Sequence, residues 1–355
     1  MDPALRVEQR RELTTRFYSN YLNFPHDGRE HISVLFYDRP LPRWFGEGLE
    51  AIQGTRWIYV DANKIASQRE VLEALWAPGK RYLSVHDYVV DTFFPGFQTA
   101  VRFTEVGHDV DYTSFEFPRF DVTQDQMEEL LWRYVRGDCR DQLQRADVFY
   151  QILGNDPGYE VVVRSGPNRT QTLVVRGPEP WMELVGPLCE GNVRFAPGAE
   201  LFYHGRQVSG TLHCNAGINL LPLRSPDPEV ELCRALLDAA QVLRDDPIDL
   251  EIRGGRVVAI RSVGPAARRF KDLFATDEAF SHVVEVGLGL SVTAGPLEYT
   301  WAATSNEAVA GIHLGIGADP ADTARFNTQV HLDFVCPDAS IEVNGKLYYD
   351  GRLFC

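Results

Sequence analysis

A charged pair interrupts an otherwise apolar, strand-like segment near the end of the chain, Val330-His331-Leu332-Asp333-Phe334. On a β-strand, residues i and i+2 point to the same face, so His331 and Asp333 would project together. Burying an ionised carboxylate costs too much free energy unless a cation or hydrogen bonds compensate its charge. The segment therefore requires either a surface strand with its polar side in solvent or a buried strand with a compensating partner, for which a metal ion is one candidate.

Three further segments place single titratable side chains among apolar residues and glycines. Glu285 is the single charge in a run of valine, leucine and glycine, and His313 is the single titratable residue of another glycine-rich segment. Glu200 follows a Pro-Gly turn, and Glu307 lies shortly before the His313 segment. Glycine within a strand often marks the close approach of a backbone or a ligand. Taken singly, His313 fits a hydrogen-bonded core histidine, and the glutamates at 200 and 307 fit ordinary turns or caps.

Taken together, these segments supply four carboxylates and two imidazoles: Glu200, Glu285, Glu307, His313, His331 and Asp333. Two divalent ions about 3.5–4 Å apart require such a set, because bridging and terminal carboxylates offset the metal charge while histidine sets the geometry. The sequence therefore predicts a two-metal centre.

The 355-residue length suggests about two domains at the usual ~100–200 residues each. Residues 1–155 alternate between strand-like and helical patterns, with helix starts predicted at Ser67 and Thr123. From about residue 156 to 355 short strands and tight turns dominate, beginning with a hairpin around residues 165–168. We expect an α/β (α+β) protein with a mixed N-terminal domain and a strand-rich, metal-binding C-terminal domain.

The charge balance disfavours a nucleic-acid partner, because 35 Lys and Arg against 50 Asp and Glu give a formal net charge of −15. No run approaches the ~18 consecutive apolar residues of a membrane helix, and no signal peptide is visible. The six cysteines form no C-x-x-C pair or dense framework. These features predict a cytoplasmic protein without nucleic-acid or membrane partners.

The order of the candidate segments resembles that of the metallo-aminopeptidase family of aminopeptidase S and aminopeptidase T. Pro197–Phe202 is similar to the family's P-x-x-E-[VL]-F segment, and Glu285–Gly289 to its glutamate–glycine motif. Glu307 followed by His313–Gly317 is similar to a glutamate ahead of the family's H-[IL]-A-[LI]-G strand, and His331–Phe334 to its closing H-x-D. With the segments between them, the likeness extends over about the last 200 residues.

The resemblance implies a metal-ligand role for each of the six residues and a centre of two divalent ions, Zn, Co or Mn. It also implies a hydrolase that cleaves an N-terminal residue, or a related amide, with metal-activated water. Glu285 and Glu307 are then candidates for moving protons, although the sequence does not assign that role to one of them. A peptide or small amide substrate and a homodimer follow from the same likeness.

Two departures from the family keep other functions open. The family commonly has a tyrosine a few residues after its histidine strand, whereas residues 318–322 of this chain contain none. Residues 1–150 also lack the sequence motifs that are usual in the N-terminal part of the family. A second branch of the superfamily, the 2,5-dihydroxypyridine ring-cleaving dioxygenases, holds one Fe(II) with two histidines and one carboxylate. In that branch histidine stands at the position of Glu285, and the positions of Glu200 and His313 are not of metal-binding type, so this chain favours the two-metal hydrolase. A non-catalytic descendant that binds a peptide or partner subunit is the third alternative.

Overall fold

The computed structural model of the chain has a mixed α/β fold, as the sequence predicted. It describes residues 3–22, 31–37, 43–54, 57–61, 68–75, 81–87, 110–115, 123–154, 158–177, 179–185, 193–196, 199–204, 206–215, 218–222, 242–293, 297, 306–319 and 330–355. The chain forms two compact units, the first of residues 1–139 and 186–198, the second of residues 140–185 and 199–355. The division expected from the sequence, at residue 155, differs in placing residues 140–155 in the first part and residues 186–198 in the second.

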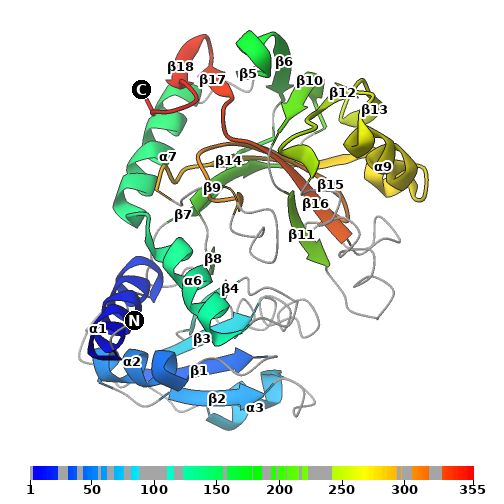
Figure 1. Ribbon diagram of the computed structural model, residues 1–355. Helices are drawn as coiled ribbons and strands as arrows, with labels where there is room; N and C mark the ends of the chain where they lie inside the picture. Colours follow the sequence, from blue (N-terminus) through cyan, green and yellow to red (C-terminus); the bar gives the residue numbers. More distant parts are fainter. Residues whose placement is uncertain are drawn as a thin grey trace. The chain divides into compact units, whose positions relative to one another are not determined.

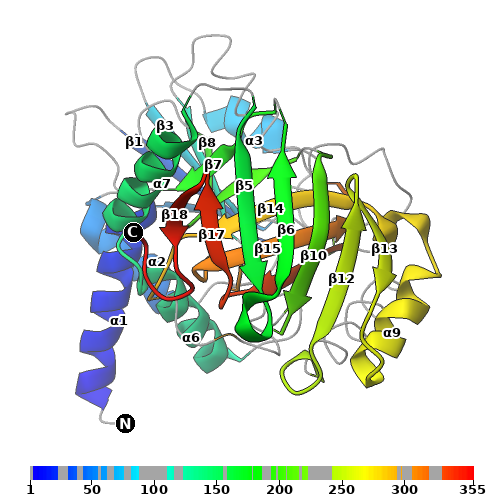
Figure 2. The same cartoon turned by 90° about the horizontal axis from the view of Figure 1, so that it is seen from above.

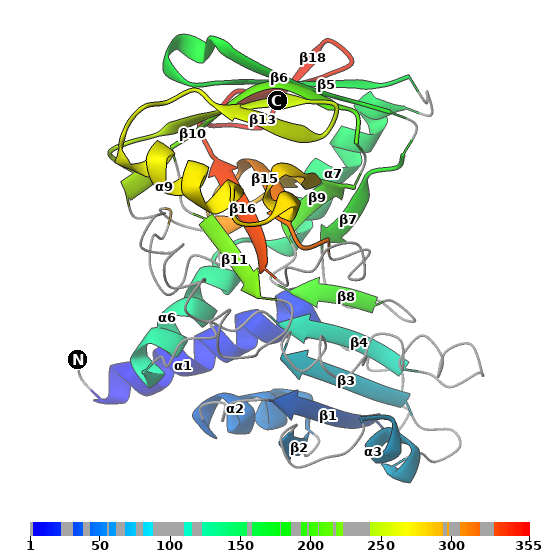
Figure 3. The same ribbon diagram turned by 90° about the vertical axis from the view of Figure 1, so that its right-hand side faces the viewer.

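The first unit contains a parallel five-stranded sheet with the strand order β2-β1-β3-β4-β8. Its strands are β1 (His31–Tyr37), β2 (Trp57–Asp61), β3 (Arg81–Asp87), β4 (Val110–Phe115) and β8 (Val193–Ala196). Its described helices are α1 (Pro3–Phe17), which continues as a π-helical turn (Tyr18–Leu22), α2 (Arg43–Gln53), α3 (Gln68–Leu75) and α6 (Gln124–Val135). Figure 3 shows the five strands side by side in this order. The β-branched and aromatic runs of the sequence account for the first two strands.

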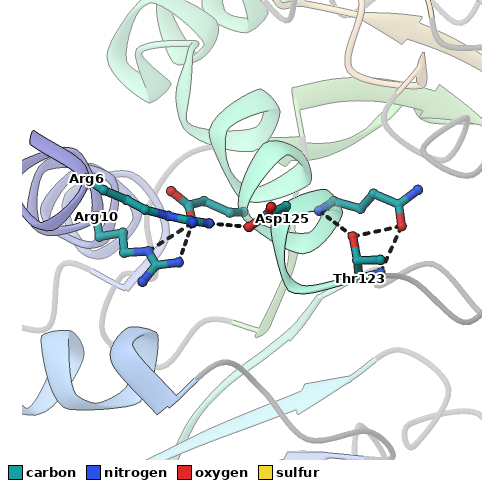
Figure 4. Close-up of polar contacts among 6 residues, drawn as sticks. Arg6, Arg10, Thr123 and Asp125 are labelled. Carbon is teal, nitrogen blue, oxygen red and sulfur yellow. Dashed lines mark hydrogen bonds and ion pairs between the residues drawn. The ribbon is translucent and has the colours of Figure 1, made fainter. Parts of the chain in front are cut away.

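A capping box fixes the start of α6, and ion pairs connect the helix to α1. The Thr123 hydroxyl accepts a hydrogen bond from the Gln126 backbone, and the Gln126 side chain accepts one from the Thr123 backbone, which forms a capping box at the predicted helix start. The guanidinium groups of Arg6 and Arg10 on α1 donate to the Glu128 carboxylate over 3.2 and 2.9 Å, and Arg6 also pairs with Asp125 (Figure 4). These ion pairs join α1 to α6.

The second unit contains two antiparallel sheets, which lie as stacked layers in Figures 2 and 3. The seven-stranded sheet has the order β13-β12-β10-β6-β5-β17-β18, and the six-stranded sheet the order β11-β16-β15-β14-β9-β7. The strands of the first are β5 (Glu160–Ser165), β6 (Gln171–Arg176), β10 (Val208–Cys214), β12 (Ile248–Arg253), β13 (Arg256–Ile260), β17 (Ser340–Val343) and β18 (Lys346–Tyr349). Those of the second are β7 (Met182–Val185), β9 (Ala199–Tyr203), β11 (Ile218–Pro222), β14 (Val283–Gly289), β15 (Gly311–Gly317) and β16 (Val330–Cys336).

The main core of the second unit lies on one face of the six-stranded sheet. Leu201, Leu288, Leu314, Leu332 and Phe334 are each at most 1% exposed and occupy alternate positions of their strands. Phe270 of α9 (Pro265–Phe274) packs against Phe334 of this core, and α7 (Cys139–Leu153) packs through Phe149 against β18 of the seven-stranded sheet. Figure 1 shows the two helices flanking the sheets. With one face of β14, β15 and β16 so apolar, the titratable residues of these strands occupy the other face.

No helix in the described part of the chain is long and apolar enough to cross a membrane.

Candidate metal centre

Five of the six predicted residues meet on one face of the six-stranded sheet, which we call the metal face. Glu200 lies on β9, Glu285 on β14, His313 on β15, and both His331 and Asp333 on β16. These four strands are consecutive neighbours in the sheet. The pairing of the strands places the five residues at positions whose side chains leave the same face of the sheet. All five are at least 92% buried. Segments far apart in the sequence thus bring three carboxylates and two imidazoles into one buried cluster.

Glycines on the metal face leave room for the two imidazoles. A β-carbon at Gly287 would collide with the ring of His313, which lies on the neighbouring strand directly opposite. A β-carbon at Gly315 would lie 2.6 Å from Cε1 of His331 and 2.9 Å from Oδ1 of Asp333. Each histidine therefore lies across a glycine of the next strand, which explains why these apolar strands are rich in glycine.

The ligand-type atoms form two groups that share Glu285. The first group contains Glu200, Glu285 and His313, with His313 Nε2 at 3.0 Å from Glu200 Oε2 and 3.3 Å from Glu285 Oε1. The second contains Glu285, His331 and Asp333, with His331 Nε2 at 3.1 Å from Asp333 Oδ1. Within each group one donor atom per residue lies within 4.8 Å of the others. A carboxylate common to two groups is the arrangement that a bridging ligand requires.

Two polar atoms of the cluster are buried without a hydrogen-bond partner in the described residues. They are His313 Nδ1 and Asp333 Oδ2. By contrast, His331 Nδ1 donates to the carbonyl oxygen of Ala318 over 2.9 Å, an outer contact that orients the ring. Unsatisfied buried polar atoms cost free energy, and imidazole nitrogens with carboxylate oxygens are the donors that Zn²⁺, Co²⁺, Mn²⁺ and Fe²⁺ accept. The residues therefore fit divalent ions.

The protonation of the cluster is set by burial and by mutual contact. Burial alone would lower the pKa of both imidazoles, but contacts with Glu200 and Glu285 raise the pKa of His313 well above its ordinary value. The neighbouring Asp333 likewise raises the pKa of His331 to about 10. Burial raises the pKa of Glu200. Burial also opposes ionisation of Glu285, yet its contact with His313 and the charge of His331 lower its pKa to about 2. Protons on the imidazoles thus balance the carboxylates when no metal ion is bound.

Glu307 does not join the other five residues. It is half-buried and belongs to neither ligand group of the described residues. The backbone of residues 307–309 nevertheless passes directly over Gly289, which is paired with Glu200 in the sheet. Its expected role as a ligand, and the proton-transfer roles of Glu285 and Glu307, stay predictions.

A third histidine beside the cluster is absent from the residues that the sequence singled out. His204 follows the last residue of β9, and its Nδ1 lies 2.9 Å from the carbonyl oxygen of Val284, the residue before Glu285. The electrostatic effect of His204 also lowers the pKa of Glu285, after the stronger effects of His313 and His331. In an extended chain, positions 200, 202 and 204 lie on the same side, so the sequence alone could have placed His204 on the side of Glu200.

Comparison with known proteins yields a match of fold alone. No protein-family model matches the chain, and no curated protein matches it. Among solved structures, a 2,5-dihydroxypyridine dioxygenase from Pseudomonas putida KT2440 aligns over 98% of this chain and 96% of its own, with a TM-score of 0.60 and 15% sequence identity. At this identity the likeness concerns the fold alone, and the aminopeptidase resemblance remains an inference from sequence motifs.

Proposed function

We propose that the protein is a metal-dependent hydrolase whose centre holds two divalent ions. The first ion would be held by Glu200, Glu285 and His313, and the second by Glu285, His331 and Asp333. The observation that carries this proposal is the presence of Glu285 in both ligand groups. The proposed reaction is removal of an N-terminal residue from a peptide, or cleavage of a related small amide.

The chain's own residues would contribute position, charge and exclusion of water. When bound, a pair of divalent ions supplies Lewis acidity and lowers the pKa of a water molecule toward neutrality. The buried carboxylates hold negative charge in a site from which solvent is largely excluded, and the Ala318 carbonyl orients His331. Glu307, half-buried and with its backbone over Gly289 of β14, is the residue we propose to move protons to and from the substrate. The homodimer and the cytoplasmic location expected from the sequence stay predictions.

A mononuclear Fe(II) enzyme is the second candidate. The dioxygenase that shares this fold favours it. However, the usual iron site of this kind takes two histidines and one carboxylate, whereas each ligand group among the described residues has one histidine and two carboxylates. The family tyrosine is missing from residues 318–322, of which 320–322 lie outside the described part of the chain.

Metal content and substrate turnover, measured on the same preparation, test the proposal. The full chain is stripped with a chelator, reloaded with Zn²⁺, Co²⁺, Mn²⁺ or anaerobic Fe²⁺, and analysed by mass spectrometry of the metals. We expect about two ions per chain and release of amine from a panel of aminoacyl anilides and dipeptides. Glu285→Gln should reduce the content to one ion or none, whereas Glu342→Gln, an ion-paired glutamate of the other sheet, should keep both.

Three results would contradict the hydrolase. One Fe²⁺ per chain with oxygen uptake on 2,5-dihydroxypyridine would establish the dioxygenase alternative, because a hydrolase consumes no oxygen. A folded protein that binds no divalent ion would favour the non-catalytic alternative. Retention of two ions by Glu285→Gln would exclude the shared-carboxylate centre.

A further inference from the structure

The backbone of β14 carries a β-bulge directly before the shared glutamate. Against β15, Val283 pairs with Ile316 and Glu285 pairs with Gly315, so Val284 is an extra residue between two consecutive pairs. A bulge changes the face that neighbouring side chains occupy, and bulges beside active sites often re-aim a side chain. Here the bulge lets Val283 join the apolar face while Glu285 lies on the metal face, although regular alternation would put both on the same face.

The side chain of His204 ties this bulge to the neighbouring strand. The backbone pairing of β9 with β14 ends at Tyr203 and Val286, which lies short of the bulge. Beyond it, the imidazole Nδ1 of His204 lies 2.9 Å from the carbonyl oxygen of Val284. A carbonyl oxygen only accepts hydrogen bonds, so Nδ1 carries the proton. The rings of Phe202 and His204 also pack in a T-shaped arrangement, with 5.0 Å between ring centroids.

We propose that His204 is a positioning residue of the metal centre, whose hydrogen bond to Val284 fixes the bulge and so aims the Glu285 carboxylate at both ion positions. The inference rests on the proposed two-metal centre. His204 belongs to neither ligand group among the described residues, and its ring is partly exposed, unlike the five ligand-type residues. It therefore acts on the ions through the backbone beside Glu285. Loss of such an outer contact typically costs about 10–100-fold in metal affinity.

Replacement of the histidine by two amides of different length separates this hydrogen bond from general packing. In His204→Asn the amide nitrogen can take the place of Nδ1, whereas in His204→Gln the amide lies one methylene farther out, close to the place of Nε2. Wild type, His204→Ala and the two amide variants are titrated with Co²⁺ by calorimetry and visible absorption. His213→Ala is the matched control, because His213 is a half-buried histidine of the other sheet that bonds to Asp249 over 2.7 Å.

We expect wild type and His213→Ala to bind two Co²⁺ ions alike. His204→Ala should bind Co²⁺ about 10–100-fold more weakly, His204→Asn should recover most of the affinity, and His204→Gln should not. Unchanged Co²⁺ affinity in His204→Ala overturns the positioning role. So does equal weakness of the Asn, Gln and Ala variants, because the loss would then come from packing. A wild type that binds fewer than two ions instead overturns the two-metal centre itself, which makes the two failures distinguishable.

Discussion

At the scale of single residues, the metal face depends on glycines, which have no side chain, as much as on the ligand-type side chains. The positions of β14 and β15 that face the centre hold either a ligand-type side chain or a glycine, and the glycines give the imidazoles their space. Gly287 shows this most clearly, because the ring of His313 occupies the place of its absent side chain. The same strands alternate these positions with fully buried leucines, isoleucines and a valine of the core.

Gly287→Ala should therefore remove one ion without unfolding the protein. The added methyl group displaces His313 from Glu200 and Glu285, so the first ligand group is lost while the second remains. Metal analysis is expected to give about one ion per chain in place of two. Leu288→Ala is the control on the opposite face: it should lower the free energy of unfolding by about 2–5 kcal/mol yet keep both ions. Full metal content in Gly287→Ala would be evidence against the packing of His313 across this glycine.

The raised pKa values of the two ligand histidines predict that metal binding releases protons. Because the pKa of His331 is about 10 and that of His313 is also well above ordinary, both rings are protonated at neutral pH in the metal-free protein. An ion can bind Nε2 only after its proton leaves, so metal affinity should rise with pH throughout the range from about 6 to 8. Calorimetry in buffers of different ionisation enthalpy measures the release. Affinity that levels off above the ordinary histidine pKa would contradict the prediction.

At the scale of helices and strands, the sequence located the strands of the candidate site and the start of α6 but not how the strands pair. The run with Glu285, the glycine-rich run with His313 and the H-x-D run are the strands β14, β15 and β16, and the predicted cap at Thr123 begins α6. Runs of apolar and β-branched residues predict that a strand exists, because these residue types favour the extended conformation and burial. The strand order, the bulge at Val284 and the placing of residues 193–196 in the first unit depend on contacts distant in sequence.

The ion pairs between α1 and α6 give a prediction at this scale. Glu128 is largely buried and accepts hydrogen bonds from both Arg6 and Arg10, so Glu128→Gln should weaken the packing of the two helices by about 1–3 kcal/mol. Glu12 pairs with Arg16 on the same helix, where both side chains are 52% exposed. Glu12→Gln should therefore cost less than about 0.5 kcal/mol. Urea denaturation followed by circular dichroism compares them, and equal losses would contradict the assigned importance of the α1–α6 contact.

At the scale of the whole molecule, all five clustered ligand-type residues belong to the second unit. Glu285, His313, His331 and Asp333 are identifiable in the sequence because an isolated titratable residue in an apolar run is conspicuous. Glu200 and Glu307 stand in ordinary turn or cap sequence and join the predicted set only through the order of the segments. His204 was not identifiable in this way, because it follows a strand and resembles an ordinary surface histidine. The chemistry of the site was thus more predictable than the residues that orient it.

Metal binding should stabilise the two units unequally. An ion that binds only the folded state stabilises it by about 2.7 kcal/mol at a hundredfold excess over its dissociation constant. Hydrogen–deuterium exchange with and without Zn²⁺ should therefore show slower exchange in β9, β14, β15 and β16. Exchange in β1, β2 and β3, which lie in the first unit and hold none of the five residues, should not change. Uniform protection of both units would contradict a centre confined to the second.

The central claim is that one carboxylate, Glu285, serves two ions, and anomalous X-ray scattering from Zn²⁺-loaded crystals tests it most directly. We predict two anomalous peaks per chain, about 3.5–4 Å apart. One peak should lie beside Glu200 and His313, the other beside His331 and Asp333, with the Glu285 carboxylate between them. A single peak held by one group, or two peaks of which either does not touch Glu285, would contradict the account.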